Sequence, residues 1–229
     1  MSEAGSAQIE LTLEERLEIK QAAERLRREF EGILNTETIE RFMTSSLDQL
    51  IVKATLSKWI PLLAERFARE RLRAMVRIEA RERGELIAPA VLFLCVHNAG
   101  RSQIAAGWLR LLAGEEVDIF TGGSEPAEGL NEGAVAAMAE VGIDISSELP
   151  KPWADEIVRS ADVIVTMGCG DACPVYPGKR YIDWDVDDPA GKTLAEIRPI
   201  RDDIGRRVRV LVADLGLDAH VAPRAAGAG

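Results

Sequence analysis

The first third of the chain repeats apolar residues at intervals of three and four, which is the spacing of amphipathic helices. This spacing predicts a first helix over residues 13–34 and a second over residues 39–54, and Pro61 suits the start of a third. Three amphipathic helices with short connections bury their apolar stripes by packing into a small bundle. We therefore expect a three-helix domain over residues 1–84.

From residue 90 onward, short apolar runs alternate with helical periodicity. Four runs have the length and composition of buried strands, and they are residues 90–94, 117–120, 162–167 and 180–184. Three helical patterns lie between or after them, and they are residues 102–109, 131–141 and about 193–214. This alternation predicts an α/β fold, with a four-stranded parallel sheet, flanking helices on both faces and ligands beyond the carboxyl ends of the strands. The predicted catalytic domain spans residues 90–216, with a linker at 85–89 before it and a tail at 217–229 after it.

The composition is that of an ordinary soluble globular protein, because 47% of the residues are apolar and 29% are charged. The net charge of −10 opposes nucleic-acid binding, since a polyanion would be repelled. An arginine-rich run at residues 66–83 is interleaved with glutamates, which favours an ion-paired face over an anion-binding surface. No apolar window is long enough to span a membrane, and the first residues lack the features of a signal peptide. We therefore expect a cytoplasmic protein with neither nucleic-acid nor membrane partners.

The most informative stretch runs from Cys95 to Ser102, between the first strand and its helix. A cysteine and an arginine six positions apart, in a loop that enters a helix N-terminus, form an oxyanion cradle. The planar guanidinium of Arg101 can bind two oxygens of a tetrahedral anion. The same positive field favours the nucleophilic thiolate form of Cys95, and Ser102 could donate to that thiolate or cap the helix. The predicted oxyanion-binding residues are Val96, His97, Asn98, Ala99, Gly100 and Arg101.

An inert buried cysteine beside a turn is the alternative interpretation of Cys95. The order of strand, Cys-x5-Arg-Ser and helix disfavours it. His97 is interpreted as a residue that shapes the loop, because a thiolate held by Arg101 needs no base. Asn98 is expected to hydrogen-bond the loop backbone, or else to be a turn asparagine in the left-handed region.

Residues 90–214 resemble the low-molecular-weight tyrosine phosphatase fold, and within it the thioredoxin-coupled arsenate reductases. The resemblance rests on CVHNAGRSQ at 95–103, on DDPAGK at 187–192 and on two further cysteines between them. It implies that Cys95 is the nucleophile, that Arg101 binds the oxyanion and that Asp188 is the general acid. The helical domain resembles the extension found ahead of some actinobacterial members.

Taken alone, an aspartate before a proline is more often a turn former than an acid. Asp188, however, lies on a loop beyond the fourth predicted strand, at the same end of the sheet as Cys95. From there its carboxyl could protonate the oxygen that leaves the substrate.

Cys169 and Cys173 directly follow the third predicted strand, at the same edge of the sheet. With the resemblance, three cysteines at one edge fit a relay in which Cys95 forms a thiol-arsenic adduct, Cys169 attacks Cys95 to expel arsenite, and Cys173 attacks Cys169. The product is a Cys169–Cys173 disulfide, which an external thiol reductant reduces, either thioredoxin or a low-molecular-weight thiol. The three residues between these two cysteines make a shorter spacing than that of the well-known thioredoxin-coupled members.

No bound cofactor or metal is expected. Cys169 and Cys173 could instead be zinc ligands, but a structural zinc site usually needs four ligands and only His97 and His220 could complete it. Ala106 stands where potassium-binding members carry a glutamate, so a potassium ion is not expected either.

The predicted function is therefore arsenate reduction, with phosphate and sulfate as competing oxyanions. Because arsenate and phosphate are nearly isosteric, a phosphatase that uses Cys95, Arg101 and Asp188 is the alternative. Phosphatases of this fold usually place aromatic residues after the Asp-Pro pair, whereas Ala190 and Gly191 follow it here. They also need no cysteine pair near the site. A regulator that senses oxyanions or redox state and signals through the helical domain is a further alternative.

Overall fold

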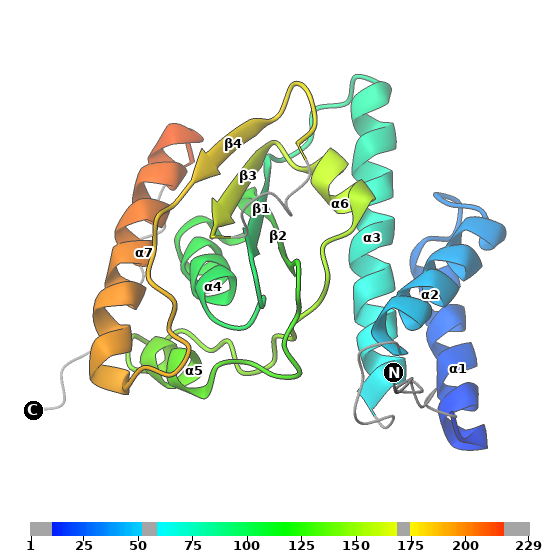
Figure 1. Cartoon of the computed structure of the whole chain (residues 1–229). Coiled ribbons are helices and arrows are strands. Elements are labelled where there is room, and N and C mark those ends of the chain that lie inside the picture. Colours follow the sequence, from blue (N-terminus) through cyan, green and yellow to red (C-terminus); the bar gives the residue numbers. More distant parts are fainter. Residues whose placement is uncertain (1–10, 52–58, 169–174, 218–229) are drawn as a thin grey trace, which may run out of the picture. The chain divides into compact units, whose positions relative to one another are not determined.

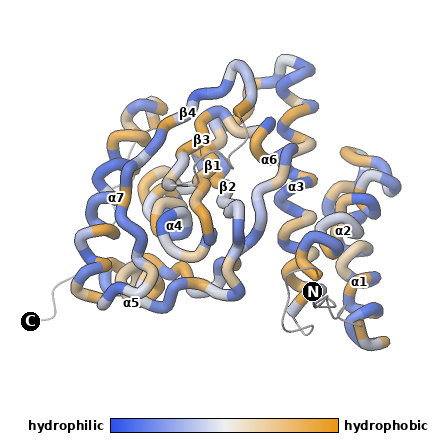
Figure 2. The backbone as a smooth tube through the Cα atoms, in the orientation of Figure 1, coloured by the Kyte–Doolittle hydropathy of each residue, from blue (hydrophilic) through white to orange (hydrophobic). Residues whose placement is uncertain are grey.

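A computed structural model describes residues 11–51, 59–168 and 175–217 (Figure 1). The chain divides into two compact units, Met1–Glu85 and Leu86–Gly229. Hydropathy alternates along the helices of the first unit, whereas β1 and β3 of the second unit are almost continuously apolar (Figure 2). Within the described ranges, none of the helices is both long and apolar enough to cross a membrane.

The first unit contains three helices, α1 (Leu13–Glu29), α2 (Thr36–Ile51) and α3 (Ile60–Glu82), as the apolar spacing predicts. Their apolar stripes meet in one buried cluster of residues: Ala22, Leu26, Phe30, Ile39, Phe42, Met43, Ala64, Ala68 and Leu72. Helix α1 ends five residues earlier than predicted, because Phe30 leaves helical geometry and Gly32 adopts a positive φ of 74°. The predicted end of the second helix, residues 52–54, lies outside the described residues.

Arg69 and Arg73 of α3 are paired with glutamates, as the interleaving predicts. Arg69 and Arg73 both bind Glu29, and Arg25 and Arg69 both bind Glu65. Burial by itself would raise the pKa of Glu65, but the hydrogen bonds from Arg25 and Arg69 outweigh burial and hold the pKa below its ordinary value. These ion pairs join α1 to α3 within the helical unit, and they engage the guanidinium groups of Arg25, Arg69 and Arg73.

The second unit is built on a four-stranded parallel sheet, which confirms the predicted α/β fold. Its strands are β1 (Ala90–Cys95), β2 (Asp118–Gly123), β3 (Val163–Met167) and β4 (Arg180–Asp183), in the order β2-β1-β3-β4. All six residues of β1 are buried, as expected of a central parallel strand. The register aligns the end of β1 with the ends of β2 and β3, so three strands terminate at one edge.

Helices α4 (Arg101–Ala113), α5 (Glu132–Ala139) and α7 (Leu194–Asp214) contribute to one core with the inner face of the sheet. Close approach of α4 and α7 depends on Gly205, since a Cβ at that position would lie 2.8 Å from the Trp108 ring. Helix α6 (Asp155–Ser160) contacts β1 and was not predicted. Its six residues are too few to show a helical period in the sequence.

Candidate functional site

The candidate site lies at the carboxyl edge of the sheet, where β1 passes through residues 96–100 into α4. A cavity of about 190 Å³ opens there. Its lining includes the predicted nucleophile, anion-binding arginine and acid, which are Cys95, Arg101 and Asp188. A larger cavity of about 570 Å³ lies in the helical unit, but four glutamates line it and no cysteine or histidine does. The chemistry therefore concentrates in the smaller cavity.

The sulfur of Cys95 is buried and receives two hydrogen bonds. The backbone N–H of Asn98 donates to Sγ over 3.2 Å, and the Oγ of Ser102 lies 3.1 Å from Sγ. Ser102 Oγ already accepts a hydrogen bond from Asn98 Nδ2 at 2.9 Å, so its own hydrogen is available to the sulfur. Both donors stabilise a negative charge on Cys95. Of the two roles considered for Ser102, the geometry favours the contact with Cys95, because α4 has Gly100 as its N-cap and no side-chain cap.

Asn98 holds the loop in its curved form. Its φ of 49° is the left-handed region, and it is the only described non-glycine residue with a positive φ. The Asn98 side-chain oxygen accepts from the backbone N–H of Lys151 at 3.0 Å, and Gln103 Nε2 donates to the Asn98 carbonyl at 3.0 Å. Sequence reasoning anticipated Asn98 but missed Gln103 and Lys151, because neither contact follows from a local pattern.

The loop directs its carbonyl groups away from the cavity and leaves amide donors behind. The carbonyl of Val96 accepts from the N–H of Glu125 at 2.8 Å, and that of His97 accepts from the N–H of Ala127 at 3.0 Å. The ring Nδ1 of His97 lies 3.0 Å from the carbonyl of Glu125, so this nitrogen carries the hydrogen. Within the part of the chain that the structure describes, the N–H groups of Ala99 and Gly100 have no acceptor. These donors make the loop suited to an anion.

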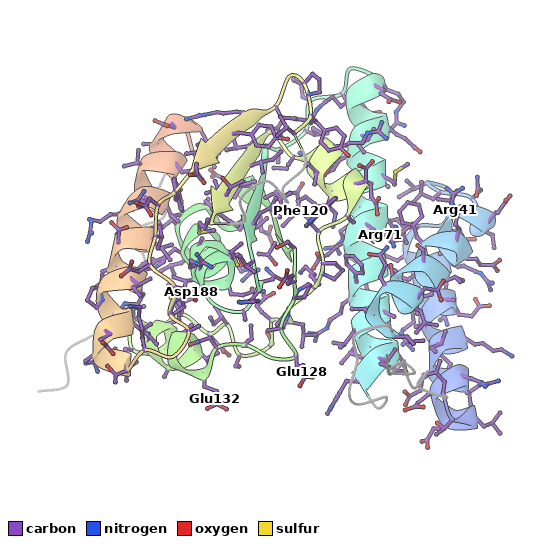
Figure 3. All side chains as sticks on the ribbon, viewed as in Figure 1. Arg41, Arg71, Phe120, Glu128, Glu132 and Asp188 are labelled. Carbon is purple, nitrogen blue, oxygen red and sulfur yellow. The ribbon has the colours of Figure 1, made fainter. Side chains whose placement is uncertain are left out.

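Arg101 and Asp188 form an ion pair at the cavity wall. Arg101 Nη2 donates to Asp188 Oδ2 over 2.6 Å, and Asp188 Oδ1 accepts from the N–H of Ala190 at 3.0 Å. Asp188 thus closes a turn with one oxygen and faces Arg101 with the other. Figure 3 labels Asp188 on the segment between β4 and α7. The backbone of Gly168 also lies close to the guanidinium, since a Cβ at this position would lie 2.9 Å from Arg101 Nη1.

The structure brings together four of the six predicted catalytic residues, which are Cys95, Arg101, Ser102 and Asp188. The other two, Cys169 and Cys173, lie outside the described residues. His220 does too, so the structure does not test the alternative in which these residues bind zinc. Across residues 11–51, 59–168 and 175–217, no group of three or more potential metal ligands occurs.

Two further residues of the cavity were not predicted as functional. Asn131 lines it as the N-cap of α5. Pro189 lies on Gly100, since a Cβ at Gly100 would stand 2.5 Å from Pro189 Cγ. The Asp-Pro pair is recognisable in the sequence, but no local sequence pattern predicts that residues 100, 131 and 189 contact one another.

Family models match both units. Residues 90–221 match the low molecular weight phosphotyrosine protein phosphatase family, and residues 19–76 match the N-terminal domain of protein-tyrosine-phosphatase-like proteins. The first match covers more than half of the chain.

Several curated relatives and solved structures that resemble this chain are arsenate reductases. Arsenate reductase 2 of Staphylococcus saprophyticus is 41% identical over 123 residues, which are 52% of this chain and 92% of the relative. The arsenate reductase of Halalkalibacterium halodurans is 40% identical over 129 residues, which are 52% of this chain and 91% of that protein. The solved thioredoxin-dependent arsenate reductase of Corynebacterium glutamicum matches 86% of this chain and 96% of its own, with 37% identity and a TM-score of 0.75. An arsenate reductase in a phosphate-binding state matches 56% of this chain and 98% of its own, with 30% identity and a TM-score of 0.51.

Proposed function

Because the chain belongs to the low molecular weight phosphotyrosine protein phosphatase family and is an arsenate reductase within it, we propose that it reduces arsenate through a covalent adduct on Cys95. The observation that carries this proposal is the sulfur of Cys95, which receives hydrogen bonds from Asn98 and Ser102 beside the guanidinium of Arg101. A nucleophile, an anion-binding group and a carboxyl share one cavity.

In the first step the Cys95 thiolate attacks the arsenic of a bound arsenate. A sulfur-arsenic bond forms and one arsenic-oxygen bond breaks. The departing hydroxide takes a proton from Asp188, which reacts in its protonated form, and leaves as water. The backbone N–H groups of Ala99 and Gly100 and the guanidinium of Arg101 hold the remaining oxygens. A guanidinium has five N–H donors, so Arg101 can bind the anion and Asp188 together. That bridge keeps the acid next to the leaving oxygen.

In the second step Cys169 attacks Cys95. A Cys95–Cys169 disulfide forms and the sulfur-arsenic bond breaks. The electron pair of the broken bond stays on arsenic, which is thereby reduced from arsenic(V) to arsenic(III) and leaves as arsenite. Cys173 then attacks Cys169, which returns Cys95 to the thiolate form and closes a Cys169–Cys173 disulfide. The sequence supports a role for Cys169, because this residue immediately follows Gly168, whose backbone lies close to Arg101.

A dithiol reductant must reopen the disulfide after each turnover. Thioredoxin is the proposed partner, because the Corynebacterium glutamicum relative is thioredoxin-dependent and matches 86% of this chain. A low-molecular-weight thiol is the alternative reductant. Such a cycle needs the reducing conditions of a cytoplasm. Phosphate and sulfate have the same tetrahedral shape and should compete with arsenate.

The test is arsenate-dependent NADPH oxidation by the full-length protein, with thioredoxin and thioredoxin reductase supplied. We expect arsenate to start NADPH consumption, and aryl-phosphate hydrolysis in a parallel assay to be slow. Fast hydrolysis of aryl phosphates without arsenate-dependent oxidation would favour the phosphatase alternative. Arsenate binding without either reaction would favour an oxyanion-sensing regulator.

The relay has its own test in Cys169→Ser and Cys173→Ser. Each change should stop multiple turnover of arsenate and leave the slow aryl-phosphate hydrolysis intact, because hydrolysis needs Cys95 alone. Mass spectrometry of the wild-type protein after one turnover should find a Cys169–Cys173 disulfide. If both variants still turn over with thioredoxin, an external thiol attacks the adduct, and a mixed disulfide on Cys95 should be found instead.

A further inference from the structure

The segment that carries Asp188 is held at the cavity by three contacts, which involve Gly100, Arg101 and Asn131. The Pro189 ring lies so close to Gly100 that a Cβ at Gly100 would stand 2.5 Å from Pro189 Cγ. Arg101 binds the Asp188 carboxylate at 2.6 Å. The third contact runs from the side-chain amide of Asn131 to the carbonyl of Pro189, with 3.4 Å between Nδ2 and the oxygen.

Asn131 also contacts the oxyanion loop and α5. Its backbone N–H donates to the carbonyl of Ala99 in the oxyanion loop at 2.9 Å. Its Oδ1 accepts from the N–H of Ala134 at 2.8 Å and so caps α5, which packs against α7. Position 131 therefore joins the oxyanion loop, a fixed helix terminus and the Asp188 segment.

The contact with Pro189 bears on Asp188 through a short turn. Asp188 Oδ1 accepts from the N–H of Ala190, so the carboxyl group takes its orientation from the backbone on either side of Pro189. A carboxyl donates a proton only when it lies within hydrogen-bond reach of the leaving oxygen. Asp188 is half-exposed, and cavity walls alone do not fix its position. The contacts of Pro189 with Gly100 and Asn131 help to fix the position of the Asp188 carboxyl group.

We propose that Asn131 is a positioning residue for Asp188, and that its side-chain amide holds the Asp188–Pro189 turn over the cavity of Cys95. This inference rests on the proposed function, in which Asp188 protonates the leaving oxygen. Asn131 touches neither arsenic nor the proton in this scheme. It acts through Asp188, so its effect should vanish when Asp188 can no longer donate.

The experiment is a double-mutant cycle in the full-length protein, read as the rate of arsenite formation in a single turnover. Asn131→Ala should slow this rate about tenfold, because a misplaced acid forfeits part of the roughly hundredfold or larger benefit of general acid catalysis. Asp188→Asn should slow it about a hundredfold or more. In the Asp188→Asn background, Asn131→Ala should add less than a factor of two. Sulfate inhibition should stay unchanged in Asn131→Ala, since the anion-binding groups are untouched.

A second variant separates the amide contact from the helix cap. Asn131→Ser keeps a hydroxyl to cap α5 but has no group that reaches the Pro189 carbonyl. It should therefore retain the thermal stability that Asn131→Ala loses, and still show the tenfold slower rate. Wild-type rates in Asn131→Ser would overturn the inference, because the cap alone would then explain Asn131.

The cycle also tests the role of Asn131 separately from the role of Asp188. If Asn131→Ala slows the reaction equally with and without Asp188, Asn131 is a structural residue and the inference fails while Asp188 stays the proposed acid. If Asp188→Asn leaves the rate of arsenite formation unchanged, the proposed role of Asp188 itself is wrong.

Discussion

Each unit of the protein contains two buried arginines, and one from each unit, Arg71 and Arg101, have different surroundings. Arg71 in the helical unit is 7% exposed and Arg101 in the sheet unit is 8% exposed. Arg71 is held by its own unit: its guanidinium stacks on the rings of Phe42 and Phe67 at 4.8 and 5.3 Å, and it donates to Ser46 at 2.9 Å. Arg71 of α3 thus stabilises the packing of α2 against α3.

Arg101 has a different set of neighbours. It binds the carboxylate of Asp188, it has the backbone of Gly168 against its guanidinium, and it lines the same cavity as the sulfur of Cys95. Burial and residue type are thus equal in the two cases. Arg101 faces an open cavity with a cysteine beside it, which suits its proposed role in binding the oxyanion. Arg71 contacts aromatic rings and hydroxyl groups, which suit a role in packing.

Cys95→Ser should have the largest effect. We expect arsenate turnover and aryl-phosphate hydrolysis to fall by at least about a thousandfold, because a serine hydroxyl is not ionised in this loop and cannot form the sulfur-arsenic bond. Steady-state kinetics on the folded variant measure it, with circular dichroism as the control. Substantial turnover by this variant would remove the basis for the assigned chemistry.

A matched pair of substitutions tests the two arginines directly. Arg101→Lys should lower kcat/KM for arsenate about a hundredfold, or about 2.7 kcal/mol, because a point charge cannot bind two oxygens in the way a planar guanidinium does. Arg71→Lys should leave kcat/KM unchanged but lower the melting temperature, because stacking on Phe42 and Phe67 is lost. If the two variants lose activity equally, the contrast between the two units is mistaken.

Local patterns were sufficient to predict the strands and the oxyanion loop. The end of β1, the loop from Cys95 and the start of α4 are adjacent in sequence, and backbone N–H groups at a helix N-terminus bind anions whatever surrounds them. The apolar runs of β1 and β3 are unambiguous because parallel strands are buried on both faces. For the same reason the three-helix unit follows from its apolar spacing.

Contacts between distant segments could not be predicted in this way. Gly100 must be small because Pro189 lies on it, and these two residues are far apart in the chain. Asn131 gives only the signal of a helix cap, and its contact with Pro189 depends on how α5 packs. Helix α6 was missed because six residues show no period. These features come from tertiary packing, which adds constraints that no local pattern contains.

A pair of glycines provides a finer test. Gly168 and Gly84 both have positive φ, at 72° and 75°, so an alanine strains the backbone by about 1–2 kcal/mol at either position. Only at Gly168 does the new Cβ meet Arg101, at 2.9 Å from Nη1, whereas nothing lies within 4 Å at Gly84. Gly168→Ala should lower kcat about thirtyfold through the displaced guanidinium, and Gly84→Ala should leave it unchanged. Similar melting temperatures with different kcat values would locate the effect at the site, whereas equal kcat values would show that Arg101 tolerates the displacement.

Removal of the helical unit should have the smallest effect on the chemistry. Every described residue of the proposed site lies between Cys95 and Ala190, and none of the contacts among them involves the first 85 residues. The Staphylococcus saprophyticus relative aligns over 92% of its own length with only 52% of this chain, so it has too little remaining sequence for a counterpart of the helical unit. A variant that begins at Leu86 should therefore fold and keep kcat within about tenfold, or about 1.4 kcal/mol in the barrier.

Two reductants make this last test discriminating. Steady-state kinetics should be measured with thioredoxin and with dithiothreitol, on protein whose circular dichroism shows an intact α/β unit. A loss well beyond tenfold with both reductants would mean that the helical unit completes the active site, and the division between the two buried arginines would have to be redrawn. A loss with thioredoxin alone would mean that the helical unit docks the protein reductant, because a small dithiol needs no docking surface. Similar rates in both assays would confine the chemistry to the sheet unit and leave Arg71 and its neighbours a structural role.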